Sequence, residues 1–384
     1  MKLEMEKVIH VLASGGWLKR KPGLERLIDE MALAQKKVGL DVAVWKISNS
    51  HTNGSSEVST EFFPRRGTGF ILSAEIKAAV NNLPPKSILH FHGSLVSEYF
   101  TLSKYIRKNR NDLKIIVSSH GGYSELTLRS LSIYKKAYFY FFEHLLIRNA
   151  SLIHLVGPTE TSGYKFYVNS SKSTLTLPNG LSDFEKNDHI ENDDLKNTEK
   201  FIISYSGDFE IKRKGLDTLI ESFKLFSEEV NSPVALWLIG RGNDEVALQK
   251  LVQHHGLEDK VKLFSNHDKL LTKNLIQQTH VFVQPSRVDC IPMTALTAAS
   301  FGVPLIITEE TNLCKFIRQY ESGWCLSKLD EENLKQALHE AYFINQTDEV
   351  KAQTIARNSY RMIREELNWN ALSKKWKEVY SSVS

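Results

Sequence analysis

The stretch VFVQPSRVDCIPMTALTAASFGVPLIIT, residues 281–308, contains the pattern that decides the fold. Two short apolar runs, VFVQ at 281–284 and LIIT at 305–308, enclose a polar turn and a segment of small residues. Two buried strands that flank a helix are typical of the βαβ unit of parallel sheets. Because ligands of such sheets bind beyond the carboxyl ends of the strands, the turn after VFVQ is a candidate ligand site.

The same alternation runs through the whole chain. Strands are predicted within these further stretches: 8–13, 41–47, 87–93, 114–121, 152–157, 201–208, 235–242 and 260–265. Between the first two, residues 23–39 keep an apolar stripe at helical spacing. The predicted fold class is α/β, with two Rossmann-like domains that face a central cleft.

A polar segment divides the two halves. The predicted parts are an N-terminal domain (1–184), a polar linker (184–200), a C-terminal domain (201–365) and a last helix (366–384) that crosses back to the N-terminal domain.

Composition limits the function classes. The 384 residues carry a net charge of +4, which is too weak to indicate nucleic-acid binding. Three cysteines (Cys290, Cys314 and Cys325) form neither a CxxC pair nor an even-numbered framework, so a reducing compartment is expected. No run is long enough for a signal peptide or a membrane span. We therefore expect a cytoplasmic protein.

Glycines and cations follow the predicted strands. Gly15, Gly16, Gly207 and Gly240 would let backbone N–H groups approach a phosphate, although glycines that merely form tight turns are the alternative. Residues 212–214 read Lys-Arg-Lys at the start of a helix, where cations oppose the helix dipole. A bound diphosphate would explain them better than a solvated charge cluster.

Several motifs together resemble the retaining glycosyltransferases of family 4 (glycosyl transferases group 1). In the C-terminal half these are GDFEIKRKGLDTLI (207–220), LWLIGRGN (236–243), HGLEDKVKLFSNHD (255–268) and PSRVDCIPMTALTAASFGVP (285–304). Residues 14–45 and the segments LHFHGS, SSHGGY and LPNGL resemble the N-terminal half of the family more loosely. The resemblance implies a B-type fold and a nucleotide-sugar donor, UDP- or GDP-linked, without a further cofactor or metal.

The resemblance also implies residue roles. Lys214, Asp289 and His120 correspond to catalytic positions: a cation for the donor diphosphate, a carboxylate for sugar hydroxyls, and an imidazole facing donor and acceptor. The donor-binding positions are Gly15, Gly16, Gly207, Arg213, Lys214, Gly240, Asn266, Cys290, Ile291, Met293 and Thr297.

Two positions depart from the family pattern. Asp208 stands where an arginine is usual, and Thr297 replaces the glutamate that usually holds the ribose. A hydroxyl lacks the charge and the two-oxygen grip of a carboxylate.

Two further segments keep alternative interpretations. His90 and His92 share one face of a predicted strand. They could bind a metal, but a structural role is favoured because no cysteine or carboxylate partner is evident. Residues 133–150 are basic and aromatic, and form either a core helix or a surface for peripheral contact with the inner membrane.

The predicted function is transfer of a sugar from a nucleotide donor to a glycan or lipid-linked oligosaccharide, in bacterial surface polysaccharide synthesis. The alternatives are a catalytically inactive binding or accessory protein, and a sugar-nucleotide epimerase of similar fold.

Overall fold

The computed structural model describes residues 7–13, 22–49, 57–168, 170–182, 200–265 and 268–383. The chain divides into two compact units: unit 1, Met1–Ser182 with Trp369–Ser384, and unit 2, Asp183–Asn368. The sequence placed these boundaries at 184 and 366. Of the predicted linker, residues 184–199 lie outside the described residues.

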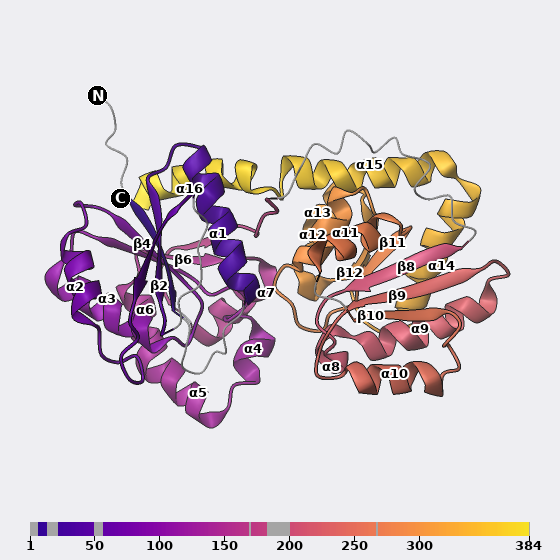
Figure 1. The fold of residues 1–384 in the computed structure, drawn as a ribbon, viewed down its shortest axis with the longest axis horizontal. Coiled ribbons are helices and arrows are strands. Elements are labelled where there is room, and N and C mark those ends of the chain that lie inside the picture. Colours follow the sequence, from indigo (N-terminus) through magenta and orange to yellow (C-terminus); the bar gives the residue numbers. More distant parts are fainter. Residues whose placement is uncertain are drawn as a thin grey trace. The chain divides into compact units, whose positions relative to one another are not determined.

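In unit 1 the described strands form one seven-stranded parallel sheet in the order β3-β2-β1-β4-β5-β6-β7 (Figure 1). They are β1 (Val8–Ala13), β2 (Val42–Ile47), β3 (Ser59–Phe63), β4 (Ile88–His92), β5 (Lys114–Ser118), β6 (Leu152–Leu155) and β7 (Thr174–Thr176). The register places His10 beside His90, and Ser118 beside both His92 and His154. This parallel arrangement follows from apolar runs that are buried on both faces.

Helices cover both faces of this sheet. They are α1 (Pro22–Lys37), α2 (Ala74–Asn81), α3 (Ser97–Asn109), α4 (Glu125–Arg129), α5 (Ile133–Tyr138), α6 (His144–Asn149), α7 (Pro158–Gly163) and α16 (Trp369–Val383), with π-helical turns at Phe139–Glu143 and Tyr164–Val168. The last helix, α16, packs along α1, and its side chains Trp376 and Tyr380 are buried within unit 1. The C-terminal helix is therefore part of the N-terminal unit.

Unit 2 contains a second parallel sheet, whose described strands have the order β10-β9-β8-β11-β12-β13. They are β8 (Phe201–Ser206), β9 (Val234–Gly240), β10 (Val261–Ser265), β11 (Val281–Gln284), β12 (Leu305–Thr308) and β13 (Gly323–Leu326). The helices are α8 (Ile211–Lys214), α9 (Leu216–Glu229), α10 (Glu245–His254), α11 (Lys269–Gln277), α12 (Met293–Ser300), α13 (Cys314–Tyr320), α14 (Glu331–Thr347) and α15 (Glu349–Glu365), with a 3₁₀ turn at Glu309–Thr311. The predicted two-domain α/β class is confirmed.

Two of the three cysteines form a disulfide that was not predicted from the sequence. Cys314, at the start of α13, forms a disulfide with Cys325 on β13, with the two Cα atoms 5.5 Å apart. An odd total did not prevent this pair, because α13 packs against β13 and brings two of the three thiols together. Cys290 is not part of this disulfide.

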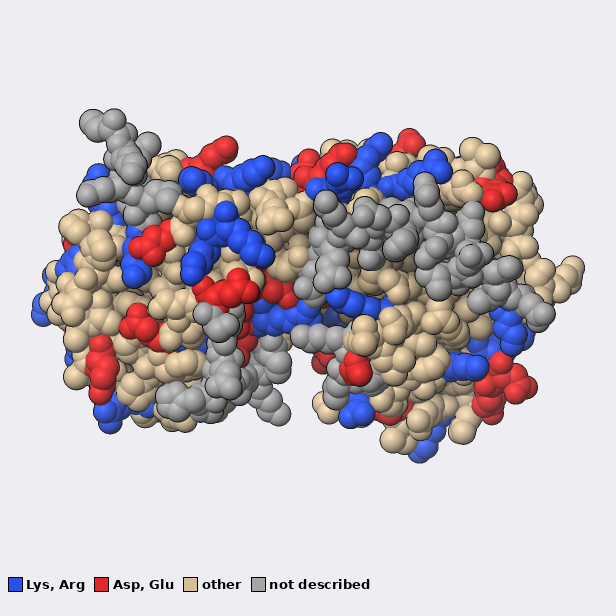
Figure 2. Space-filling model, turned by 45° about the horizontal axis from the view of Figure 1, so that its top comes forward, with Lys and Arg blue, Asp and Glu red and all other residues tan. Residues whose placement is uncertain are grey.

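The surface carries both signs of charge. On the face drawn in Figure 2, acidic and basic side chains are interspersed over each unit. None of the described helices combines the length and apolarity needed to span a bilayer.

Candidate functional site

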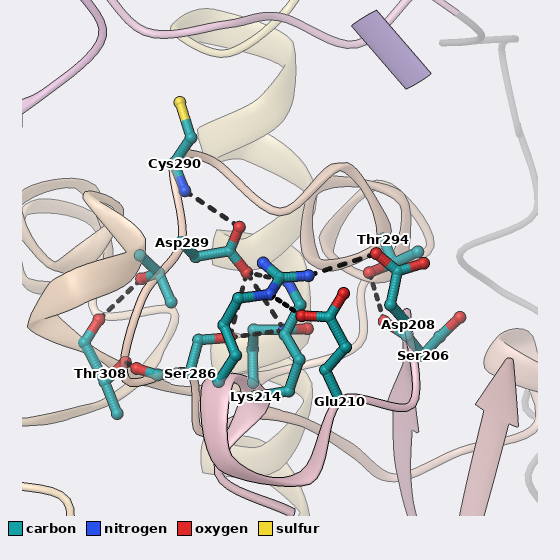
Figure 3. A network of polar contacts seen from close by, with 12 residues as sticks. Ser206, Asp208, Glu210, Lys214, Ser286, Asp289, Cys290, Thr294 and Thr308 are labelled. Atoms are coloured by element: carbon teal, nitrogen blue, oxygen red, sulfur yellow. Dashed lines mark hydrogen bonds and ion pairs between the residues drawn. The ribbon is translucent and has the colours of Figure 1, made fainter. Parts of the chain in front are cut away.

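The candidate site of unit 2 lies where β8 and β11 end. These neighbouring strands are followed along the chain by β9 on one side of the sheet and by β12 on the other, so the strand order reverses between them. Such a reversal leaves a crevice beyond the carboxyl ends of the strands, which is where ligands of this sheet type bind. Lys214, Asp289 and their neighbours gather at this edge (Figure 3).

A buried ion pair occupies the centre of the site. Lys214 Nζ donates to Asp289 Oδ2 at 2.6 Å, and the two side chains are only 9% and 12% exposed. Lys214 ends α8, and Gly215 then adopts φ 69°, which turns the chain into α9. A Cβ atom at residue 215 would lie 2.0 Å from the Pro285 carbonyl oxygen, so glycine is needed to bring α8 against the turn after β11.

Asp289 accepts further hydrogen bonds. Its Oδ2 atom also accepts from Ser286 Oγ at 3.0 Å and from Gln284 Nε2 at 3.5 Å. Its Oδ1 atom accepts from the backbone N–H of Cys290 at 2.9 Å. These donors hold the carboxylate in one orientation, so Asp289 fixes the position of the Lys214 ammonium group.

Residues that the sequence analysis did not single out hold this turn in place. Thr308 Oγ1 donates to the Ser286 carbonyl at 2.6 Å, and Asn312 Nδ2 donates to the Cys290 carbonyl at 2.9 Å. Thr294 Oγ1 donates to the Ser206 carbonyl at 2.7 Å, which links α12 to the end of β8. Thr308 ends β12 and Ser286 lies two residues after β11, so a polar residue at the carboxyl end of each strand was the available signal.

The structure separates the three adjacent cations. Lys212 is 87% exposed and pairs with Asp217 at 2.8 Å. Arg213 pairs with Asp208 at 3.3 Å and with Glu210. Lys214 pairs with Asp289, so its ammonium group lies at the strand edge.

Gly240 has a packing role that a tight turn alone does not explain. It ends β9 with φ 151°, and a Cβ atom there would lie 1.9 Å from the Gly207 carbonyl oxygen. Glycine is therefore required where the loops after β8 and β9 approach each other.

The remaining donor-binding predictions fall in or near α12. Cys290 and Ile291 precede this helix, Met293 begins it, and Thr297 lies one turn later. The Thr297 hydroxyl donates to the Met293 carbonyl at 3.0 Å, which leaves its oxygen as an acceptor. Gly15, Gly16 and Asn266 lie outside the described residues.

His120 lies in unit 1, in the turn of residues 119–123 that follows β5. Its φ is 50°, a conformation that non-glycine residues adopt at a cost. The buried Glu160 carboxylate stabilises this turn, because it accepts from Gly121 N–H at 2.6 Å, from Tyr123 N–H at 3.3 Å and from the Ser119 hydroxyl. Burial raises the pKa of Glu160, and these hydrogen bonds lower it in part. The sequence analysis did not single out Glu160.

Comparison with known proteins finds a family match within unit 2. Residues 186–360 match the family model "Glycosyl transferases group 1". The amylovoran biosynthesis glycosyltransferase AmsK of Erwinia amylovora is 25% identical over 133 residues, 33% of this chain and 32% of its own length. The lipopolysaccharide core biosynthesis glycosyltransferase LpsE of Rhizobium meliloti is 27% identical over 130 residues, which are 34% of this chain and 36% of its own length. The matched segments thus span about a third of these curated relatives.

Solved structures match over nearly the whole chain. Anabaena Alr3699/HepE in complex with UDP has a TM-score of 0.75 and 14% identity, covering 98% of this chain and 100% of that one. A glycosyltransferase from Rickettsia africae ESF-5 has a TM-score of 0.75 and 13% identity, covering 99% of each chain. The chain therefore has the two-domain fold of these solved structures, and its residues 186–360 match the glycosyl transferases group 1 model.

Proposed function

We propose that this protein is a retaining glycosyltransferase of family 4, which transfers a sugar from a nucleotide donor to a glycan or lipid-linked acceptor. The observation that carries the proposal is the buried Lys214 ammonium group at the β8–β11 strand edge. The polysaccharide-synthesis relatives and the UDP complex of a similar fold support it. UDP-sugars are the first donors to test.

The chemistry asks for a cation where the donor diphosphate leaves. Negative charge grows on the leaving phosphate in the transition state, and a preorganised ammonium group stabilises that charge. Asp289 would hold Lys214 in place before the donor arrives and would accept a hydroxyl of the donor sugar. The leaving phosphate would assist the incoming hydroxyl on the same face of the sugar, so that no protein nucleophile is required.

Two positions support an alternative, a binding or accessory protein without catalysis. Asp208 and Glu210 form ion pairs with Arg213, so the guanidinium charge is already paired with carboxylates rather than left for a diphosphate. Thr297 supplies one hydroxyl in place of a carboxylate.

The discriminating experiment measures nucleotide release from a panel of UDP- and GDP-sugars, with a glycan or lipid-linked acceptor present. The proposal predicts release with one donor and its loss in Lys214→Met. Nucleotide binding without release in any combination would favour the accessory protein, and binding of no nucleotide diphosphate would overturn the proposed glycosyltransferase. Epimerised donor without transfer would indicate the epimerase.

We also propose peripheral contact with an anionic membrane through residues 133–150. Tyr138 and Phe139 in this segment are buried, so it contributes to the core of unit 1. Ile133, Tyr134 and Tyr140, by contrast, are 73%, 72% and 70% exposed. Aromatic side chains beside exposed cations are typical of interfacial binding. Sedimentation with phosphatidylglycerol vesicles should deplete the protein from solution, and a Tyr134→Ser/Tyr140→Ser variant should stay in solution.

A further inference from the structure

A network of buried polar side chains lies within unit 1. It joins neighbouring strands of the sheet to α1 and α16, and each strand and helix side chain in it is at most 3% exposed. Its members are His10 on β1, His90 and His92 on β4, Ser118 on β5, His154 on β6, Gln35 on α1 and Tyr380 on α16. The network ends at two groups in loops, the Leu177 carbonyl and the His120 side chain.

Three of these histidines also lie close enough to resemble a metal site. His10, His90 and His92 offer nitrogen atoms within 4.8 Å of one another. However, His10 Nδ1 and His92 Nε2 are hydrogen-bonded to each other at 2.8 Å. Both nitrogens of His90 are engaged as well, with Tyr380 at 3.0 Å and with Ser118 at 2.6 Å. Hydrogen bonding therefore explains the cluster without an ion.

The four imidazoles on the strands of this network are neutral because they are buried. Burial lowers the pKa of His10 and of His154 to about 4. Burial, followed by the neighbouring histidines, holds the pKa values of His90 and His92 well below the usual range. A neutral imidazole has one N–H donor and one acceptor nitrogen, so each hydrogen bond fixes the direction of the next.

The direction of the hydrogen bonds in this network is fixed at the Leu177 carbonyl oxygen, which can only accept. His154 Nε2 lies 2.9 Å from this oxygen and must donate, so His154 Nδ1 accepts from the Ser118 hydroxyl at 2.7 Å. With its one proton used, Ser118 accepts from His90 Nε2. His90 Nδ1 then accepts from the Tyr380 hydroxyl.

The same logic continues to His120. The Tyr380 oxygen, its proton used, accepts from the Gln35 amide nitrogen at 3.2 Å, and the Gln35 amide oxygen accepts from His10 Nε2 at 2.9 Å. His10 Nδ1 therefore accepts from His92 Nε2. His92 Nδ1 in turn accepts from His120 Nε2 at 2.9 Å. Each donor has an acceptor, and no step allows the reverse direction.

We propose that Gln35 is a positioning residue that sets the proton of His120 on Nε2 by way of His10 and His92. Nδ1 of a neutral His120 is then an acceptor. It can meet a hydroxyl group, but it cannot donate to a phosphate oxygen. This ligand preference rests on the proposed function, whereas the position of the proton does not.

The position of the proton can be measured without any substrate. Long-range ¹H–¹⁵N spectra of protein labelled with ¹⁵N-histidine distinguish Nε2–H from Nδ1–H rings, and the His120 signals are those lost in His120→Gln. The proposal predicts the Nε2–H form for His120 in the wild type. The Nδ1–H form there would overturn it, whether or not Gln35→Met folds.

Gln35→Met then tests whether Gln35 sets the position of the proton on His120. Methionine offers no acceptor to His10 Nε2, so an N–H at that position would be buried without a partner. His10, His92 and His120 should therefore change towards the Nδ1–H form. His90 and His154 are the internal controls, since the Leu177 carbonyl still fixes them. A folded Gln35→Met protein with unchanged His120 signals would overturn the role of Gln35.

A transfer assay separates this inference from the proposed function. Gln35→Met should lower kcat by roughly tenfold or more, because a wrong tautomer disables an imidazole, while UDP affinity at unit 2 stays unchanged. If the wild type transfers no sugar, the proposed function fails and the spectra still decide the tautomer. If His120 changes its proton and kcat does not change, the ligand preference is wrong.

Discussion

Removal of the Lys214 ammonium group tests the buried ion pair. Lys214→Met keeps the length of the side chain. It leaves the Asp289 carboxylate, which is only 12% exposed, without its cation. Breaking a buried pair by removing one partner costs about 3–5 kcal/mol. Asp289 keeps its contacts to Ser286, Gln284 and the Cys290 N–H, so we expect the lower end, about 3 kcal/mol. For a domain of 150–250 residues this lowers Tm by roughly 6–12 °C.

Chemical denaturation, followed by tryptophan fluorescence, measures this loss as a change in the free energy of unfolding. The double variant Lys214→Met/Asp289→Asn leaves neither charge buried, and should return to within about 1 kcal/mol of the wild type. Lys212→Met is the matched control, because Lys212 is 87% exposed and its pair is screened by water. If Lys214→Met unfolds within about 0.5 kcal/mol of the wild type, the reasoning about burial is refuted.

Three further predictions concern single residues. Thr297→Glu should tighten nucleotide binding, because a carboxylate accepts from both ribose hydroxyls; weaker binding in calorimetry would show a pocket adapted to threonine. Glu143 has its pKa raised to about 7 by burial, so it keeps its proton in the folded state while the unfolded chain loses it. The free energy of unfolding should therefore fall by up to about 3 kcal/mol as the pH rises from about 4.5 to about 7. In Glu143→Gln that part of the pH dependence should vanish, and parallel stability curves for the two proteins would contradict the assignment. Glu160→Ala removes the acceptor of three donors in the 119–123 turn and should cost about 3 kcal/mol, while UDP affinity at unit 2 is retained. Unfolding at the wild-type denaturant midpoint would show that water replaces the carboxylate.

The sequence predicted the strands in the middle of each sheet because those strands are apolar on both faces. It missed β3, β7 and β13, which lie at sheet edges and are only partly buried. An edge strand has one neighbour and needs no continuous apolar run, so its residues resemble those of loops.

The candidate site was predictable in part. Lys214 and Asp289 could be singled out by resemblance, but their contact joins residues 75 positions apart and depends on the packing of α8 against the turn after β11. In the same way, His90 and His92 share a face by strand periodicity. Their link to His10 requires the order of the strands, and their link to Gln35 requires the packing of α1, neither of which local patterns contain.

The central claim is that Lys214 holds the diphosphate of a nucleotide donor. Titration calorimetry of UDP into the wild type, Lys214→Met and Lys212→Met measures this directly, since the two variants lose the same charge from adjacent residues. We predict binding to the wild type and to Lys212→Met, with affinity reduced at least tenfold in Lys214→Met, or about 1.4 kcal/mol. Equal UDP affinity for Lys214→Met and the wild type, with both proteins folded, would contradict the claim.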